Sequence, residues 1–132
     1  MSNINLIAGI TLQGVNVAAN NTPLNIGLQG ITLGCTAYFY DNFFQATTAG
    51  AVVALPAATV YVAYVRNLGA NPITVSFSPV GGIPSSVVLS VVTTGFGGVF
   101  WYMQTLEANG GITSMTLTAG TAATSCEVFL AY

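Results

Sequence analysis

The chain has 132 residues, which is enough for one domain with a core of its own. Only 3% of the residues are charged, against about 25% in an ordinary soluble domain, and there is no His and no Lys. The scarcity of cations argues against nucleic-acid binding and membrane attachment, and the missing bases argue against most catalytic and cofactor chemistry.

The low charge also bears on assembly. An exposed monomer normally stays dispersed through surface charge, whereas the centres of protein interfaces are depleted in charge. The composition therefore predicts that other protein subunits cover much of the surface. A surface kept in solution by neutral Asn, Thr, Ser and Gln side chains is the alternative.

The N-terminal part differs in composition from the rest. Residues 1–35 are rich in Asn, Gly and Gln, and we predict that they form an arm or edge strands that reach a neighbouring subunit. The tetrad Gly-Ile-Thr-Leu occurs at residues 9–12 and 30–33, and two copies are too few to indicate a solenoid. The first ten residues lack the basic region of a secretory signal. Residues 36–132 are predicted to form the sandwich core.

An aromatic cluster, YFYDNFF, opens this core region. Large aromatic side chains mostly fill cores, so the first interpretation is a core strand that runs into a turn at Asp41 and Asn42. The second is an interface anchor, because Tyr and Phe are enriched at the desolvated centres of interfaces. The interface candidates of this cluster are Tyr38, Tyr40, Phe43 and Phe44.

Strand-like runs and turn-forming segments alternate from residue 59 onward. The predicted strands cover residues 59–66, 72–78, 86–92, 99–104, 112–118 and 124–131. Their starts lie about 12 to 14 residues apart, and no segment shows a helical apolar stripe. Residues 42–65 are uncharged, but Gly50 and Pro56 interrupt them, so we expect no membrane-spanning helix. The sequence thus predicts an all-β fold, a single-domain antiparallel β-sandwich of the jelly-roll type.

Few side chains could support chemistry. A glycosidase-like carboxylate pair could come only from Asp41, Glu107 and Glu127, and their spacing does not favour one. Cys35 and Cys126 are too few for a disulfide scaffold or a zinc site, and the sequence fits either free thiols or a single bridge. We therefore expect no enzyme activity, no metal site and no cofactor.

Three further residues are interface candidates. The only cation, Arg66, ends a predicted strand, where it could form a surface ion pair with Glu127 or contact another subunit. Trp101 and Tyr102 lie in the most aromatic strand. We predict that Trp101 fills the core, because its strand is apolar on both faces, and keep a role in binding as the alternative.

A strand that ends in an Arg-Asn-Leu turn, at residues 61–69, precedes a second strand of alternating Thr and Val at residues 71–75. Together with the ending, residues 110–130, this pattern resembles small virion structural proteins of tailed bacteriophages, over residues 50–132. The resemblance implies a β-sandwich or jelly roll, often trimeric, that decorates or cements a capsid or belongs to a tail or fibre. The chain departs from such proteins in its scarcity of charge.

The resulting hypothesis is a virion structural protein, assembled in the host cytoplasm, that acts as a capsid decoration or cement subunit. Its expected partners are further copies of itself, in a trimer, and capsid or tail proteins, with no nucleic acid and no membrane. One alternative is a tail or fibre module that binds a glycan through Trp101, Tyr102 or residues 38–40. Another is a subunit of a self-assembling filament.

Overall fold

A computed structural model describes residues 37–56, 59–92, 97–103 and 110–132, together with the backbone of four short strands nearer the N-terminus. The chain divides into two units, Met1–Gly34 and Cys35–Tyr132. The described residues contain strands and turns but no helix. None of them belongs to a helix with the length and hydropathy that a membrane span requires.

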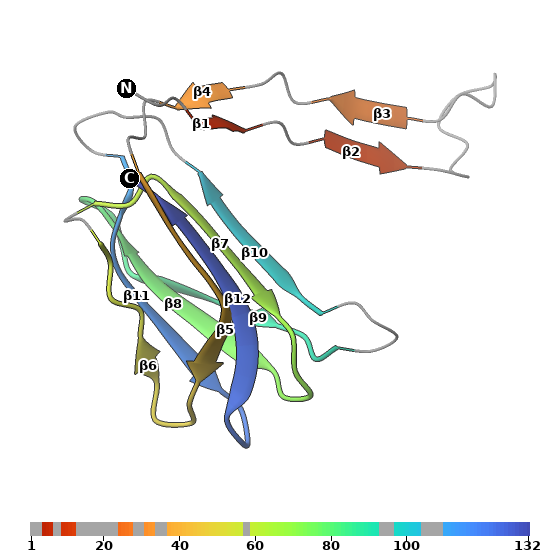
Figure 1. The fold of residues 1–132 in the computed structure, drawn as a ribbon, viewed down its shortest axis with the longest axis vertical. Helices are drawn as coiled ribbons and strands as arrows, with labels where there is room; N and C mark the ends of the chain where they lie inside the picture. Colours follow the sequence, from red (N-terminus) through yellow and green to blue (C-terminus); the bar gives the residue numbers. More distant parts are fainter. Residues whose placement is uncertain are drawn as a thin grey trace. The chain divides into compact units, whose positions relative to one another are not determined.

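The larger unit is a sandwich of two four-stranded antiparallel sheets (Figure 1). One sheet has the order β10-β7-β12-β5 and the other has the order β6-β11-β8-β9. The strands are β5 (Tyr38–Ala46), β6 (Ala51–Val52), β7 (Val62–Asn67), β8 (Ile73–Pro79), β9 (Ser85–Leu89), β10 (Val99–Met103), β11 (Ile112–Ala119) and β12 (Thr124–Ala131). The predicted antiparallel β-sandwich is therefore confirmed.

The pairing of these eight strands is nested. β5 pairs with β12, β6 with β11, β7 with β10 and β8 with β9, so the first strand lies beside the last and each following pair lies inside the previous one. Two further ladders, β7 with β12 and β8 with β11, join these pairs into the two sheets.

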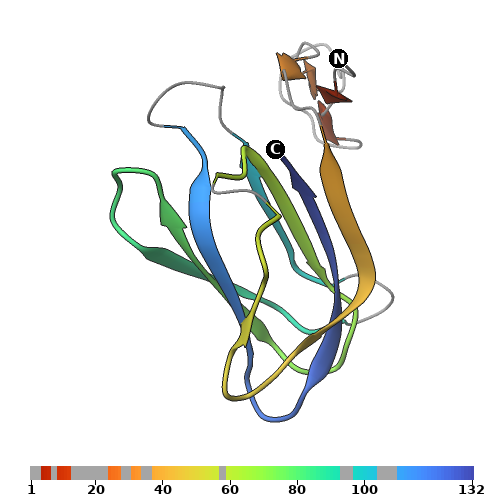
Figure 2. The same ribbon diagram turned by 60° about the vertical axis from the view of Figure 1, so that its left-hand side comes forward.

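The core lies between the two layers, which Figure 2 shows side on. Alternate residues of each central strand point inward, as period-two side-chain placement requires. In β12, Cys126, Val128 and Leu130 are fully buried, while the residues between them are half-exposed. Phe77 of one sheet contacts Phe100 of the other, with ring centroids 5.0 Å apart. The strands predicted after residue 59 are all present, with ends shifted by a few residues.

The turn predicted at Asp41 and Asn42 is wrong, because β5 continues through both residues. Asp41 pairs with Val128 and Phe44 with Cys126, so Asn42 and Phe43 together stand opposite the single residue between these partners. Such a β-bulge takes one backbone group out of the ladder. Here the side chain of Asp41 replaces the lost partner, since its Oδ1 accepts a hydrogen bond from the Phe43 N–H at 2.8 Å.

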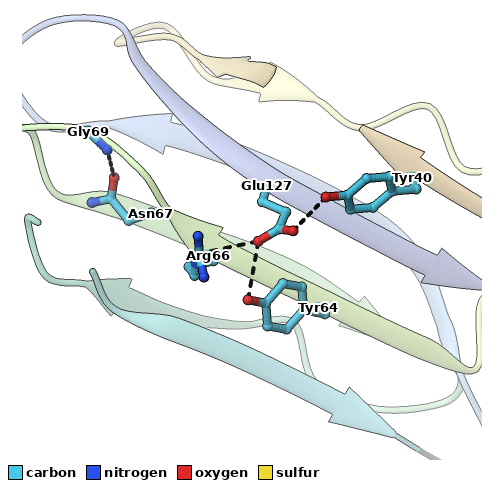
Figure 3. Close-up of polar contacts among 6 residues, drawn as sticks. All are labelled: Tyr40, Tyr64, Arg66, Asn67, Gly69 and Glu127. Carbon is cyan, nitrogen blue, oxygen red and sulfur yellow. Dashed lines mark hydrogen bonds and ion pairs between the residues drawn. The ribbon is translucent and has the colours of Figure 1, made fainter. Parts of the chain in front are cut away.

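Asn67, the last residue of β7, fixes the loop that follows. Its side chain is fully buried, and its Nδ2 donates to the carbonyl oxygens of Asn71 at 2.8 Å and Ser90 at 2.9 Å. Its Oδ1 accepts a hydrogen bond from the Gly69 N–H at 2.9 Å (Figure 3). Three backbone groups that leave the sheet at this point thus gain a partner, as buried polar groups require.

The smaller unit contains two short antiparallel ladders. β1 (Ile4–Leu6) pairs with β4 (Ile31–Leu33), and β2 (Gly9–Leu12) pairs with β3 (Leu24–Gly27). The two copies of the Gly-Ile-Thr-Leu tetrad therefore contribute to strands of different ladders, which gives no support for a structural repeat.

Candidate binding face

Four aromatic residues line up across the outer surface of the β10-β7-β12-β5 sheet. Trp101 pairs with Tyr64, Tyr64 with Phe129, and Phe129 with Tyr40, so the four residues lie directly opposite one another on adjacent strands. Adjacent strands lie about 4.8 Å apart, which makes this aromatic row about 14 Å long. We refer below to Trp101, Tyr64, Phe129 and Tyr40 as the aromatic row.

Both ends of the aromatic row are open to solvent. Trp101 is 53% exposed and Tyr40 is 51% exposed. The prediction that Trp101 fills the core is wrong, because its neighbours Phe100 and Tyr102 take the inward positions of β10 and leave Trp101 on the outer surface. Its indole contacts the ring of Tyr64, with centroids 4.9 Å apart and planes at 59°.

An ion pair lies beside the aromatic row, two residues along β7 and β12 from Tyr64 and Phe129. Arg66 and Glu127 are cross-strand partners, and the Arg66 Nε lies 3.4 Å from the Glu127 Oε2, as the sequence suggested. The Tyr40 hydroxyl donates a hydrogen bond to the Glu127 Oε1 at 2.7 Å, and the Tyr64 hydroxyl donates to the Oε2 at 3.3 Å (Figure 3). One carboxylate is thus held by one guanidinium and two phenols.

The carboxylate perturbs the titration of both phenols. The hydrogen bond to Glu127 raises the pKa of Tyr40, with smaller contributions from desolvation and the negative charge. Burial is the main cause of the raised pKa of Tyr64, and the charge of Glu127 adds to it. Both hydroxyls therefore remain protonated donors at neutral pH, which keeps the carboxylate in place.

The aromatic row and Glu127 line an open hollow of about 330 Å³. This volume lies at the lower end of the range for small-molecule sites, about 300 to 1,000 Å³. Among the described residues, no three His, Cys, Asp or Glu side chains lie close enough together to bind a metal ion. The hollow therefore offers aromatic rings for stacking, beside the ion pair of Arg66 and Glu127.

The other predicted candidates are divided between the two sides of the sheet. Tyr38 is 66% exposed and Phe43 is 71% exposed, and Tyr38 stacks on Phe129 with ring centroids 6.0 Å apart. Phe44 packs against the core instead. Tyr102 does so too, and its hydroxyl donates to the Gly111 carbonyl oxygen at 3.1 Å.

Cys126 is a free, fully buried thiol whose Sγ lies 3.4 Å from the Phe44 carbonyl oxygen. Cys35 and Glu107 lie outside the described residues.

Sequence reasoning missed Tyr64 and Phe129 as members of the face. Both stand between buried residues, since Ala63 and Val65 flank Tyr64 and Val128 and Leu130 flank Phe129. Because apolar residues surround Tyr64 and Phe129 on both sides, no alternation of polar and apolar residues marked them as outward-facing.

The outer surface of the other sheet has a different character. Its open hollow, of about 380 Å³, is lined mainly by hydroxyl groups. The hydroxyl side chains of this hollow are Ser76, Ser78, Ser85, Ser86, Ser114 and Thr116. Aromatic side chains thus line one outer face and small hydroxyls the other.

Comparison of the chain with protein-family models, with curated proteins and with solved structures finds no match in any of the three.

Proposed function

We propose that the chain is a virion structural protein, a capsid decoration or cement subunit that acts through protein–protein contacts rather than catalysis. The observation that carries the proposal is the lack of net charge on surfaces that partners could cover. Residues 1–34 contain no charged residue, and the whole chain has only four, Asp41, Arg66, Glu107 and Glu127. Removing the uncharged surface of residues 1–34 from water carries no charge-desolvation penalty, which favours permanent assembly.

The register of the N-terminal ladders supports self-association. In the β2·β3 ladder, Ile10 is paired with Ile26 and Leu12 with Leu24, whereas Thr11 is paired with Asn25. Apolar pairs therefore alternate with a polar pair along this ladder. Two-stranded ladders are marginal on their own in water, so we infer that the apolar pairs need a cover. We propose that further copies of the chain supply it in a homo-oligomer.

The exposed edge strand of the β10-β7-β12-β5 sheet supplies the proposed contact to the capsid. β5 is an edge strand of its sheet, and Tyr38 at its start and Phe43 in its bulge are mostly exposed. Aromatic side chains are enriched at interface centres, and edge strands offer backbone groups for pairing. We assign these two residues to contacts with a neighbouring shell protein.

We also propose that the sandwich is a jelly roll. The nested pairing of first with last strand, second with seventh, third with sixth and fourth with fifth supports this assignment. This fold is common among viral capsid domains, in agreement with the virion role.

The homo-oligomer is tested with two charge-matched variants of the full chain. Ile10→Lys with Ile26→Glu replaces an apolar pair of the ladder by an opposite-charge pair, and Thr11→Lys with Asn25→Glu introduces the same charges at the adjacent polar pair. We expect light scattering to show an oligomer for the wild type and the second variant, and a monomer for the first. A monomeric wild type at about 100 µM would contradict the proposal, because dissociation constants of stable assemblies lie far lower.

The capsid contact is tested by sedimentation with virions of the virus that encodes the chain. We expect the tagged wild type to migrate with the particles and the Tyr38→Ala, Phe43→Ala variant to remain unbound. Val52→Ala with Val88→Ala is the control, because both valines are exposed on the other sheet, at 74% and 65%. Equal binding by the two variants would reject the assigned contact.

A further inference from the structure

The aromatic row borders the proposed capsid contact, since Tyr38 stacks on Phe129, but Trp101, Tyr64 and Tyr40 are not assigned to any protein contact. We propose that the row is a binding site for a neutral oligosaccharide. The inference goes beyond the structural role, because the N-terminal ladders and the edge residues Tyr38 and Phe43 carry the proposed protein contacts.

The geometry of the row fits a chain of sugar rings. Its four aromatic residues are in register across all four strands and extend about 14 Å, which exceeds the length of one sugar ring. The C–H face of a pyranose is apolar and weakly positive, so it stacks on the negative face of an aromatic ring. The half-exposed rings of Trp101 and Tyr40 provide such surfaces at the two ends of the row.

The polar groups beside the row fit the rim of a sugar. A pyranose carries hydroxyls around its edge, and each hydroxyl needs both a donor and an acceptor. The carboxylate of Glu127 lines the hollow and is held in place by Tyr40 and Tyr64. The Arg66 side chain is 49% exposed, and its Nε lies 3.4 Å from the Glu127 Oε2, so the guanidinium, which carries five N–H donors, is accessible from solvent. Acceptor and donor groups thus lie beside the stacking surface.

The charges select the class of ligand. Single-stranded nucleic acid also stacks on aromatic rows, but it needs a basic groove for its phosphates. Here the only cation of the chain is neutralised by Glu127. Acidic glycans are disfavoured for the same reason. A neutral sugar places no unpaired charge in the hollow.

The single tryptophan makes the test direct. Trp101 is the only Trp of the chain and lies in the site, so its fluorescence reports on binding there without labelling. The full chain is first applied to a glycan array and then titrated with maltotetraose, cellotetraose, mannotetraose and N-acetylchitotetraose. We expect at least one neutral glycan to change the fluorescence saturably, with a dissociation constant that stays within about twofold between 0.05 and 0.5 M NaCl because no charge pairs with the ligand.

Matched variants assign the binding to the row. We expect Tyr40→Ala, read by fluorescence, and Trp101→Ala, read by calorimetry, each to weaken binding by about tenfold or more, the loss expected for one stacked ring. Tyr40→Phe keeps the ring and loses only the hydroxyl, and we expect a smaller effect. Val88→Ala on the other sheet should bind as the wild type does. Thermal unfolding of each variant verifies that it is folded.

Three results would overturn the inference. The first is an array and four titrations without any saturable response up to about 10 mM, beyond the millimolar range of weak specific binding. The second is binding that Trp101→Ala leaves unchanged. The third is loss of virion binding or of the oligomer in Trp101→Ala without any glycan response, which would make the row a protein interface. Because the oligomer and sedimentation assays do not depend on sugars, failure here leaves the proposed structural role standing.

Discussion

Asn67 shows how one buried side chain can hold a loop in place. Its amide satisfies the carbonyls of Asn71 and Ser90, and its carbonyl oxygen satisfies the N–H of Gly69. The loop after β7 therefore depends on this residue for two hydrogen bonds, to Gly69 and Asn71, and a third reaches Ser90 after β9, whose carbonyl oxygen also accepts from the Gly98 N–H. No aliphatic residue of similar volume could supply these bonds.

Replacement of Asn67 should consequently be costly. We expect Asn67→Ala to lower the free energy of unfolding by about 2 to 4 kcal/mol, because it leaves several backbone groups without their partner. Asn42→Ala is the control, since Asn42 is exposed in the bulge of β5 and should change stability by less than about 0.5 kcal/mol. Urea unfolding measures both. Equal losses would contradict the role assigned to Asn67.

The buried thiol of Cys126 is expected to lower the stability of the folded chain at alkaline pH. Burial raises the pKa of its thiol from 9.0 to about 12. A raised folded pKa means that the contribution to stability is complete below about pH 9 and is lost as the pH rises toward 12. The raised pKa values of Tyr40 and Tyr64 act in the same direction at higher pH. The chain has no Lys, so no lysine titration obscures this range.

We expect urea midpoints of the wild type to be level from pH 6 to 7 and to fall above pH 9. Cys126→Ala should be less stable at every pH, because it leaves a small cavity, but its midpoint should fall less steeply between pH 9 and 10. Parallel curves for the two proteins would show that the thiol does not control the pH dependence.

At the scale of strands, two glycines with positive φ differ in their surroundings. Gly111 has φ +102°, and a Cβ added there would lie 2.9 Å from the Val60 carbonyl oxygen, in the turn before β11. Gly81 has φ +64°, and a Cβ there would meet nothing within 4 Å. The first position thus adds a steric restriction to the conformational one.

Alanine at Gly81 and at Gly111 should separate the cost of the backbone conformation from the cost of the steric contact. We expect Gly81→Ala to cost about 1 kcal/mol for its backbone conformation alone. Gly111→Ala should cost about 3 kcal/mol or more, because it also presses on backbone that cannot move without disturbing the ladder. Thermal unfolding compares the two variants with the wild type. A similar loss for both would mean that the segment before β11 adapts readily.

Sequence patterns predicted strands well where turns and period two agreed. The alternation of Ile73, Val75 and Phe77 with Thr and Ser identified β8, and its residues lie as predicted. The patterns failed where every residue is apolar or aromatic. Trp101 could face either way in VFWYM, and only the packing of Phe100 and Tyr102 against the core decides its exposure.

The binding face was only partly predictable for a related reason. Tyr40, Arg66 and Trp101 were recognised singly, and the pairing of Arg66 with Glu127 was anticipated. Their assembly into one row depends on strand register, which joins β10, β7, β12 and β5 across large distances in sequence. Local patterns do not contain the register between distant strands.

For the whole molecule, the scarcity of charge should make the proposed homo-oligomer insensitive to salt. Electrostatic contributions to association weaken as salt screens them, but apolar burial does not. The described surface offers only Asp41 and the Arg66–Glu127 pair as charged groups. We expect the dissociation constant of the homo-oligomer to change by less than about threefold between 0.05 and 1 M NaCl, measured by sedimentation equilibrium. A steep decrease in affinity would show that ion pairs hold the subunits together.

The nested pairing of strands determines when the sandwich can form during synthesis. Of the eight strands of the sandwich, β5 is made first, yet its partner β12 is made about 80 residues later, and the β7·β12 ladder also waits for β12. Contacts so distant in sequence slow folding and leave apolar strands uncovered in the meantime. β7 can pair earlier with β10, but β5 has no neighbour in its sheet other than β12 and therefore stays without a partner strand until translation has passed residue 131.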